Sequence, residues 1–314
     1  MTNRVSRLAP SPTGALHLGN ARTFLVNWAL ARREGWRLLM RIEDLDGPRV
    51  KPRAVRKTLE ILTWLGLDHD DPVICQSADL EPYRRAMGLL AERGRVYACP
   101  LTRKQIEQAA SAPHGDEHEL RFPPALRPTD EAARRFDRQD TNYRFLVPDE
   151  AIGIEDAFTG SSTHRPFDEV GDFVVWTGRG VPAYQLAVVV DDARQQVTDV
   201  VRGDDLLPSA ARQTLLYRAL DLTPPQFWHL PLVLGPDGRR LAKRHGDTRL
   251  HAYRQAGVTA QRITGLLAWW SGVGDRPEEM SAADFRDRLT LDRLSRAPVT
   301  FTEDDHEWLL AGCR

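Results

Sequence analysis

The chain has 314 residues, 41% of them hydrophobic and 28% charged, which is typical of a globular protein with one large or two modest domains. Its formal net charge of −1 excludes a global electrostatic attraction to nucleic acid, so an RNA partner would need a local basic face. The three scattered cysteines are too few for a disulfide framework, and no apolar run has the length of a signal peptide or a membrane helix, so we expect a cytoplasmic protein.

The first part of the chain predicts a strand, a helix and a second strand. Val5–Ala9 is a short apolar run that Pro and Gly residues end, and apolar residues then follow at helical spacing from Gly19 to Gly35. Trp36–Ile42 is the second predicted strand, and a further helix is expected at Arg53–Leu65. Such a unit builds a parallel sheet, and ligands bind at the carboxyl ends of its strands.

The middle of the chain interrupts this alternation. A polar, Pro-rich stretch from about Cys99 to Asp168 predicts an insertion rather than more of the sheet. Afterwards Val188–Val190 is predicted as a fully buried strand. A strand, a loop and a helix follow, with Ser209 as the predicted N-cap.

The last part of the chain predicts a turn and then helices. Pro236–Gly238 is the expected tight turn between a strand and a basic loop, and the pattern is helical from Thr248 onward. Two helix starts have the sequence of a capping box, in which an N-cap hydroxyl pairs with an acidic residue three positions later. These pairs are Ser281 with Asp284 and Thr302 with Asp305.

The sequence PSPTGALHLGN joins the first strand to the following helix. Here His17 and Asn20 can present polar side chains to a phosphate, and Gly19 allows a flat base to approach the backbone. The start of the helix adds unpaired N–H groups and a positive dipole. Taken alone, the segment fits a Gly/Pro turn with a surface histidine equally well.

Acidic residues follow the second strand in the sequence RIEDLD. Glu43 can pair with the ammonium of an amino acid, whereas Asp44 and Asp46 fit a solvated acidic turn. Two later residues suit the other end of such a ligand, because Arg202 can pair with a carboxylate and Tyr184 can donate a hydrogen bond to one. Without further context, an interfacial tyrosine and an arginine beside a helix are the simpler interpretation.

A basic loop, GRRLAKRHG, follows the last predicted strand. Its cations can neutralise a triphosphate as pyrophosphate leaves, although a charge run is more often a solvated surface; they are Arg239, Arg240, Lys243 and Arg244. Lys243 favours the functional interpretation because the chain has only 4 lysines against 39 arginines. A compact ammonium interacts with a moving phosphate differently from a planar guanidinium.

The order of these motifs resembles one known family. APSPTGALHLGNART followed by RIEDLD is similar to the glutamyl and glutaminyl branch of the class I aminoacyl-tRNA synthetases. His17–Asn20 stands where those enzymes carry HIGH, and Arg240–Arg244 stands where they carry KMSKS. Within the branch, DEVGDFVVW, PAYQLAVVVDDA and VVRGDDLLPSAARQTLLY resemble the glutamyl-queuosine tRNA(Asp) synthetases, which are shortened paralogues of glutamyl-tRNA synthetase.

The resemblance covers nearly the whole chain and implies a fold. It implies an α/β protein with the Rossmann-like parallel-sheet core of class I synthetases, an inserted subdomain and a C-terminal helical region. The expected parts are 1–98 and 169–245 for the two halves of the catalytic domain, 99–168 for an acceptor-binding insertion, and 246–314 for helices like those that contact the tRNA stem. The last segment resembles the helices before the anticodon-binding region of full-length glutamyl enzymes, so we expect no anticodon-binding domain.

The resemblance also implies a role for each matching position. Glutamate would be bound by Arg7, Ala9, Ser11, Glu43, Tyr184 and Arg202. ATP would be held by His17, Gly19, Asn20 and Lys243, and His17, Asn20 and Lys243 are the expected catalytic residues. The implied enzyme is a monomer that forms glutamyl-adenylate from L-glutamate and ATP, with Mg²⁺ on the phosphates, and passes glutamate to queuosine at the wobble position of aspartate tRNA.

The sequence departs from the family at three places. Asn20 replaces the final histidine of HIGH, and Ala242 stands where KMSKS has a serine. Relatives often hold a structural zinc with a Tyr-x-Cys-x-Cys motif and a later Tyr and Cys. Here Tyr97 and Cys99 match its start, but no further cysteine follows until Cys313.

A structural zinc site is therefore not expected. Zinc needs about four ligands, and one thiolate cannot supply them. A rescue by His114, Asp116 and His118 is the less favoured alternative. We expect a metal-free insertion.

Other functions stay open at this stage. The chain could activate glutamate for another acceptor: an ordinary tRNA end, a carrier protein or a small amine. It could instead be a non-catalytic binding protein on the same fold, or a fragment of an ordinary glutamyl-tRNA synthetase.

Overall fold

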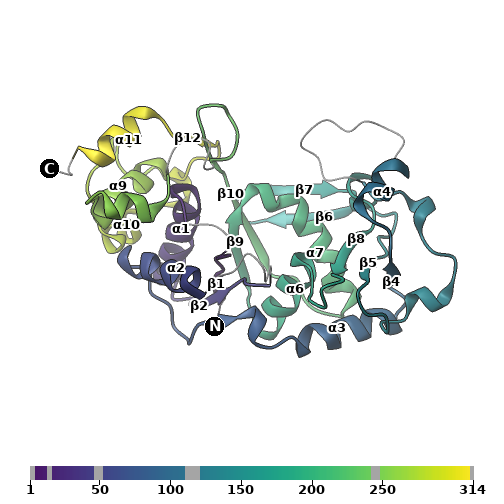
Figure 1. Cartoon of the computed structure of the whole chain (residues 1–314). Helices are drawn as coiled ribbons and strands as arrows, with labels where there is room; N and C mark the ends of the chain where they lie inside the picture. The colour runs from purple at the N-terminus through teal and green to yellow at the C-terminus, as the bar shows by residue number, and fades with distance from the viewer. Residues whose placement is uncertain (1–3, 13–15, 46–51, 110–120, 242–247, 312–314) are drawn as a thin grey trace.

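The computed structural model describes residues 4–12, 16–45, 52–109, 121–241 and 248–311. Figure 1 shows an elongated arrangement of these residues, with the central strands between two ends. One end holds the C-terminal helices, and the other holds a small antiparallel sheet.

Two sheets that lie side by side form the centre. The first has the order β1 (Val5–Leu8), β2 (Arg37–Ile42) and β3 (Ile74–Cys75), all parallel. The second has the order β7 (Gly160–His164), β6 (Ile152–Asp156), β10 (Gln226–Leu230) and β9 (Asp199–Gly203), in which only β7 is antiparallel. The sheets meet where the N–H of Thr198 donates to the carbonyl of Val5 at 2.9 Å.

Helix α1 (Leu18–Glu34) connects β1 to β2 and confirms the predicted strand–helix–strand unit. Its apolar residues are buried along most of its length, and it ends at Gly35, whose φ of 68° is the left-handed conformation that glycine adopts readily. The predicted helix after β2 is α2 (Pro52–Trp64). Because β1 and β2 are parallel, their carboxyl ends and the start of α1 lie at one edge of the sheet.

The predicted strand at Val188–Val190 is wrong, because these residues lie inside helix α6 (Tyr184–Arg194). The helix is buried continuously from Gln185 to Asp192, so its sequence shows no alternation between an apolar and a polar face. Valine favours strands by intrinsic propensity, but burial between other elements overrides that preference.

The predicted N-cap at Ser209 is also wrong. Helix α7 (Leu207–Ala219) starts earlier, with Leu206 as its N-cap and Pro208 in its first turn. Proline suits the first turn because the N–H that it lacks would have no partner there. Ser209 is instead buried in the helix and accepts a hydrogen bond from Gln185 at 3.0 Å.

The small antiparallel sheet at the other end of the molecule has the order β4 (Val96–Cys99), β5 (Asn142–Phe145) and β8 (Phe173–Trp176). In the sequence, helix α3 (Glu81–Glu92) precedes β4, and helices α4 (Arg103–Ala109) and α5 (Pro166–Glu169) lie between β4 and β8. Strands from the predicted insertion pair with strands outside it, since β5 pairs with β8 and β6 pairs with β10. The domain boundaries at 98/99 and 168/169 stay a prediction.

Helices dominate the end of the chain, as expected. They are α8 (Leu250–Gln255), α9 (Ala260–Trp270), α10 (Ala282–Arg288) and α11 (Glu303–Leu310), with a short parallel pair of strands, β11 (Val233–Leu234) and β12 (Val299–Thr300). Both predicted capping boxes are confirmed, at Ser281 with Asp284 and at Thr302 with Asp305.

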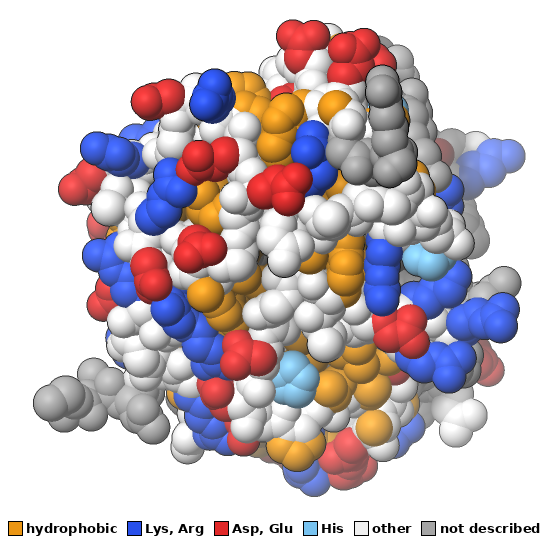
Figure 2. Space-filling view, turned by 90° about the vertical axis from the view of Figure 1, so that its left-hand side faces the viewer, with side chains coloured by type: hydrophobic (Ala, Val, Ile, Leu, Met, Phe, Trp, Pro, Cys, Tyr) orange, Lys and Arg blue, Asp and Glu red, His pale blue; other side chains and the backbone are white. Residues whose placement is uncertain are grey.

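Figure 2 views the molecule from this end. On the left of the face, Lys and Arg side chains alternate with Asp and Glu side chains, whereas several Lys and Arg side chains lie close together on the right. Within the part of the chain that the structure describes, no helix has both the length and the apolar composition needed to cross a membrane.

Candidate active site

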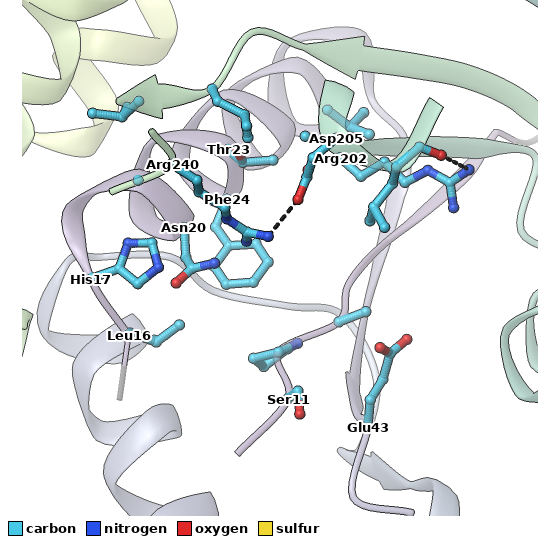
Figure 3. Close-up of a pocket in the computed structure, with 18 of the residues that line it drawn as sticks. Ser11, Leu16, His17, Asn20, Thr23, Phe24, Glu43, Arg202, Asp205 and Arg240 are labelled. Atoms are coloured by element: carbon cyan, nitrogen blue, oxygen red, sulfur yellow. Dashed lines mark hydrogen bonds and ion pairs between the residues drawn. The ribbon is translucent and has the colours of Figure 1, made fainter. Parts of the chain in front are cut away.

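A pocket of about 550 Å³ opens at the carboxyl ends of β1, β2 and β9, beside the start of α1. All the predicted site residues within the described ranges line it: Arg7, Ala9, Ser11, His17, Gly19, Asn20, Glu43, Tyr184 and Arg202. Lys243 lies outside the described residues. Figure 3 shows His17, Asn20 and Arg240 on one side of this pocket and Ser11 and Glu43 on another.

His17 and Asn20 belong to the start of α1. His17 is the N-cap in extended conformation, its side chain makes no capping hydrogen bond, and its Nδ1 atom is buried without a partner among the described residues. Burial, and then the charge of Arg240, lower the pKa of His17 to about 4, so the imidazole is neutral at physiological pH. The start of a long helix, a neutral imidazole and the Asn20 amide suit a phosphate.

Gly19 lies directly against the His17 ring. A Cβ atom at this position would sit 3.2 Å from both Cε1 and Nδ1 of that ring. The glycine therefore gives the histidine its space, as well as leaving the backbone open to a ligand. Apolar side chains nearby suit a flat base: Leu16, Phe24, Leu232 and Val233.

Both sides of the basic loop are attached near this end of the pocket. In the first half of the loop, the N–H of Leu241 donates to Val233 at 3.0 Å, and Arg240 pairs with Asp205 (Figure 3). After the loop, the N–H of Leu18 donates to Thr248 at 3.2 Å. The segment that contains Lys243 thus begins and ends beside the HIGH-like residues.

Glu43 and Arg7 meet a buried ionic network on the opposite side of the pocket. Arg41, which the solvent does not reach, donates to Asp192 Oδ1 at 2.6 Å and to Glu43 Oε1 at 3.3 Å. Arg7 Nε lies 3.4 Å from the same Asp192 oxygen. Burial raises the pKa of Glu43, and the neighbouring guanidinium groups oppose that shift. The backbone N–H of Glu43 also donates to Pro10 at 3.1 Å.

Arg202 lies at the end of β9 and is almost entirely buried. Its Nε donates to His229 Nε2 at 2.9 Å, its Nη1 donates to Gln213 Oε1 at 2.8 Å, and its Nη2 donates to the carbonyl of Leu206 at 3.3 Å. All three acceptors are uncharged groups. Because a guanidinium has five N–H donors, both terminal nitrogens keep a hydrogen for a ligand.

Tyr184 is the first residue of α6 and is exposed, so its side chain can reach the pocket. Tyr184 also lines a second cavity of about 550 Å³. The polar lining of this second cavity comes from both sides of the predicted insertion boundary: Arg103, Asn142, Arg144, Asp172, Gln185 and Arg212.

The sequence prediction missed the residues that hold these side chains in place. Arg41, Asp192 and Gln213 lie within family-like segments of the sequence and His229 lies outside them, but none of the four stands out as a site residue until the fold brings it to the site. One sequence signal was present for Asp192: two adjacent aspartates follow an apolar run, and such groups are rarely buried without partners.

The positions that match the zinc motif of relatives make other contacts. Tyr97 donates to Asp172 at 2.7 Å, and Cys99 is buried in an apolar cluster with Ile106 and Phe122. Within the described ranges, no group of three or more His, Cys, Asp or Glu side chains is arranged to hold a metal ion. His114, Asp116 and His118 lie outside those ranges, so the metal-free insertion stays a prediction.

Residues 4–308 match the family model for tRNA synthetases class I (E and Q), catalytic domain. The chain belongs to this family. It is 46% identical over 305 residues to a glutamyl-Q tRNA(Asp) synthetase of Symbiobacterium thermophilum, covering 93% of this chain and 94% of that protein.

Two further relatives agree with this. The class I synthetase is 42% identical over 320 residues to a glutamyl-Q tRNA(Asp) synthetase of Rhodopirellula baltica, covering 98% of this chain and 94% of the relative. Its fold is similar to the crystal structure of a glutamate-tRNA synthetase from Elizabethkingia anophelis, with a TM-score of 0.82 and 26% identity over 98% of this chain and 70% of that one. The predicted α/β synthetase fold is confirmed.

Proposed function

We propose that this class I synthetase activates L-glutamate with ATP and transfers the glutamyl group to queuosine in aspartate tRNA. One observation carries the proposal: a single pocket joins two buried arginines and an acidic side chain, which complement an amino acid with two carboxylates, to the HIGH-like helix start, which suits ATP. The relatives that match this chain almost end to end are named glutamyl-Q tRNA(Asp) synthetases.

In the first step, an oxygen of the glutamate α-carboxylate attacks the α-phosphorus of ATP. The bond from that phosphorus to the bridging oxygen breaks, pyrophosphate leaves, and glutamyl-adenylate remains bound. Both reacting groups are anions, so the main task of the protein is to hold them in line and stabilise charge on the phosphates. Mg²⁺ would accompany ATP, since such ions are held largely by the substrate phosphates.

Each predicted side chain then has a chemical task. Glu43 pairs with the substrate ammonium, while Arg7 and Arg202 pair with carboxylates, assisted by Tyr184 and Ser11. His17, Asn20 and the N–H groups at the start of α1 contact ATP, and Lys243 neutralises the departing pyrophosphate. Ala9 and Gly19 contribute backbone beside the two substrates.

In the second step, a hydroxyl of the cyclopentene ring of queuosine attacks the carbonyl carbon of glutamyl-adenylate. The bond to the phosphate oxygen breaks, AMP leaves, and the hydroxyl proton is released. No covalent intermediate with the enzyme is needed. We assign the acceptor to the second cavity, because it shares Tyr184 with the first and its arginines suit RNA phosphates.

Transfer of radiolabelled glutamate to purified aspartate tRNA tests this function. We expect label on queuosine-containing tRNA and none on the same tRNA prepared from cells that lack queuosine. Periodate treatment removes vicinal diols and should abolish labelling at the modified base. Labelling at the 3′ end of queuosine-free tRNA would contradict the proposal and indicate an ordinary synthetase activity.

A further inference from the structure

Three neighbouring strands bring Asp156, His229 and Arg202 into a line beneath the pocket. The strands β6, β10 and β9 are adjacent in the sheet, and His229 lies directly opposite Arg202 in the register of β10 and β9. His229 is wholly inaccessible to solvent, and Asp156 and Arg202 are almost so. The three residues are distant in the sequence, so the sheet alone sets this arrangement.

The hydrogen bonds define which nitrogen of His229 carries the proton. Arg202 Nε can only donate, so His229 Nε2, at 2.9 Å, must accept. The proton therefore resides on Nδ1, which donates to Asp156 Oδ2 at 2.6 Å. Burial lowers the pKa of His229 despite this bond to Asp156, which favours the same neutral imidazole.

Asp156 is held as a carboxylate. Its oxygens also accept the backbone N–H groups of Phe158 at 2.9 Å and Thr159 at 2.8 Å. Burial alone would favour the protonated acid, but the bonds from His229 and from these amides lower the pKa of Asp156 to about 2. The carboxylate thus fixes the tautomer of His229 at physiological pH.

Arg202 has no carboxylate among the described residues within 4 Å of its nitrogens. The face of its guanidinium is covered by Phe227, with the central carbon 5.0 Å from the ring centre. Burial lowers the pKa of Arg202. A buried cation with only neutral partners is costly, and an arriving carboxylate removes that cost.

We propose that His229 is a positioning residue that orients Arg202 for a carboxylate of glutamate without neutralising its charge. The imidazole accepts the hydrogen bond from Arg202 Nε and lies between Arg202 and Asp156. The carboxylate of Asp156 therefore does not pair with the guanidinium, whose positive charge stays available to the substrate. A carboxylate in place of the imidazole would pair with Arg202 and compete with glutamate. This inference rests on the proposed function, since it assumes that the ligand is glutamate.

Replacement of His229 tests the role through the separate requirements for the two substrates. In ATP–pyrophosphate exchange, His229→Leu should raise the KM for glutamate by about tenfold or more and change the KM for ATP by less than about twofold. His229→Gln should bring the KM for glutamate most of the way back to that of the unaltered enzyme, because the glutamine amide can donate to Asp156 and accept from Arg202. Equal changes in both KM values would overturn the proposal.

A double variant asks whether His229 acts through Arg202. When Arg202→Ala is already present, His229→Leu should add little to the KM for glutamate, because the group that it positions is gone. Fully additive effects of the two substitutions would overturn the proposal. Melting temperatures of all variants show whether any loss of exchange comes from unfolding.

Nitrogen NMR of the unaltered enzyme keeps the proposal testable if the leucine variant fails to fold. With ¹⁵N-labelled histidine at neutral pH, His229 should show a protonated Nδ1 and an unprotonated, hydrogen-bonded Nε2. A proton on Nε2 would overturn the proposal. Unaltered enzyme without glutamate-dependent exchange would instead contradict the proposed function, whereas normal exchange with an unchanged glutamate KM in His229→Leu would contradict the role of His229 alone.

Discussion

Arg41 Nη2 lies 3.3 Å from Oε1 of Glu43, and this contact orients the carboxylate at the edge of the pocket. Arg41 is itself fixed by Asp192, at 2.6 Å, so Glu43, the acid that we propose faces the substrate ammonium, is supported by a buried ion pair. The substrate ammonium needs Glu43 in its ionised form, and the pKa of this group therefore affects binding.

Glutamate binding should weaken as the pH falls. Burial raises the pKa of Glu43 above its ordinary value of 4.5, so the group gains a proton, and loses its charge, at a higher pH than an exposed glutamate does. We predict that kcat/KM for glutamate decreases as the pH falls through this raised pKa. Exchange measured from about pH 5 to pH 8 with saturating ATP checks this. Glu43→Gln should have a high glutamate KM at every pH, and a KM like that of the unaltered enzyme would contradict the assignment.

The two buried arginines should control the glutamate requirement. Arg7→Ala and Arg202→Ala each remove a charge-assisted hydrogen bond to a carboxylate, so the KM for glutamate should rise by about tenfold to a hundredfold, and the KM for ATP should rise much less. Arg56→Ala, an exposed site on α2, is the control. Equal effects on both substrates would rule out the carboxylate assignment.

Gly19→Ala should weaken ATP binding. The new Cβ would lie 3.2 Å from the His17 ring and displace it, so the KM for ATP should rise several-fold while the KM for glutamate stays close to its starting value. Gly88→Ala in α3 is a matched control because a Cβ there meets nothing within 4 Å. The control should be fully active and more stable by roughly 1 kcal/mol. An unchanged ATP KM in Gly19→Ala would contradict the placement of ATP.

Lys243→Ala should reduce adenylate formation by about an order of magnitude or more, because we propose that the lost charge stabilises the departing pyrophosphate. The melting temperature should stay unchanged. Single-turnover formation of glutamyl-adenylate measures this step directly. Lys104→Ala, on the exposed surface of α4, controls for loss of a lysine. Nearly normal turnover in Lys243→Ala would remove this residue from the mechanism.

Many of the residues that line the candidate site could be picked out from the sequence because they follow strands or start helices. Glu43 follows β2, Arg202 lies at the end of β9, and His17 caps α1. In parallel sheets the carboxyl ends of strands meet at one edge, so positions along the sequence translate into neighbours in space.

Other parts could not be predicted, for two physical reasons. The valines of α6 are buried on every side, so no periodicity separates a helix from a strand there. Asp156 and His229 contribute through pairing of β6 with β10, a contact between segments that are far apart in the chain, and neither belongs to a motif.

Glutamate-dependent exchange of pyrophosphate into ATP, without tRNA and across all twenty amino acids, tests the central claim most directly. We predict exchange with glutamate and only background with the other nineteen, including aspartate and glutamine. Exchange that requires added tRNA would favour the ordinary glutamyl-tRNA synthetase mode. No exchange under either condition would contradict the account and leave a binding protein on a synthetase fold.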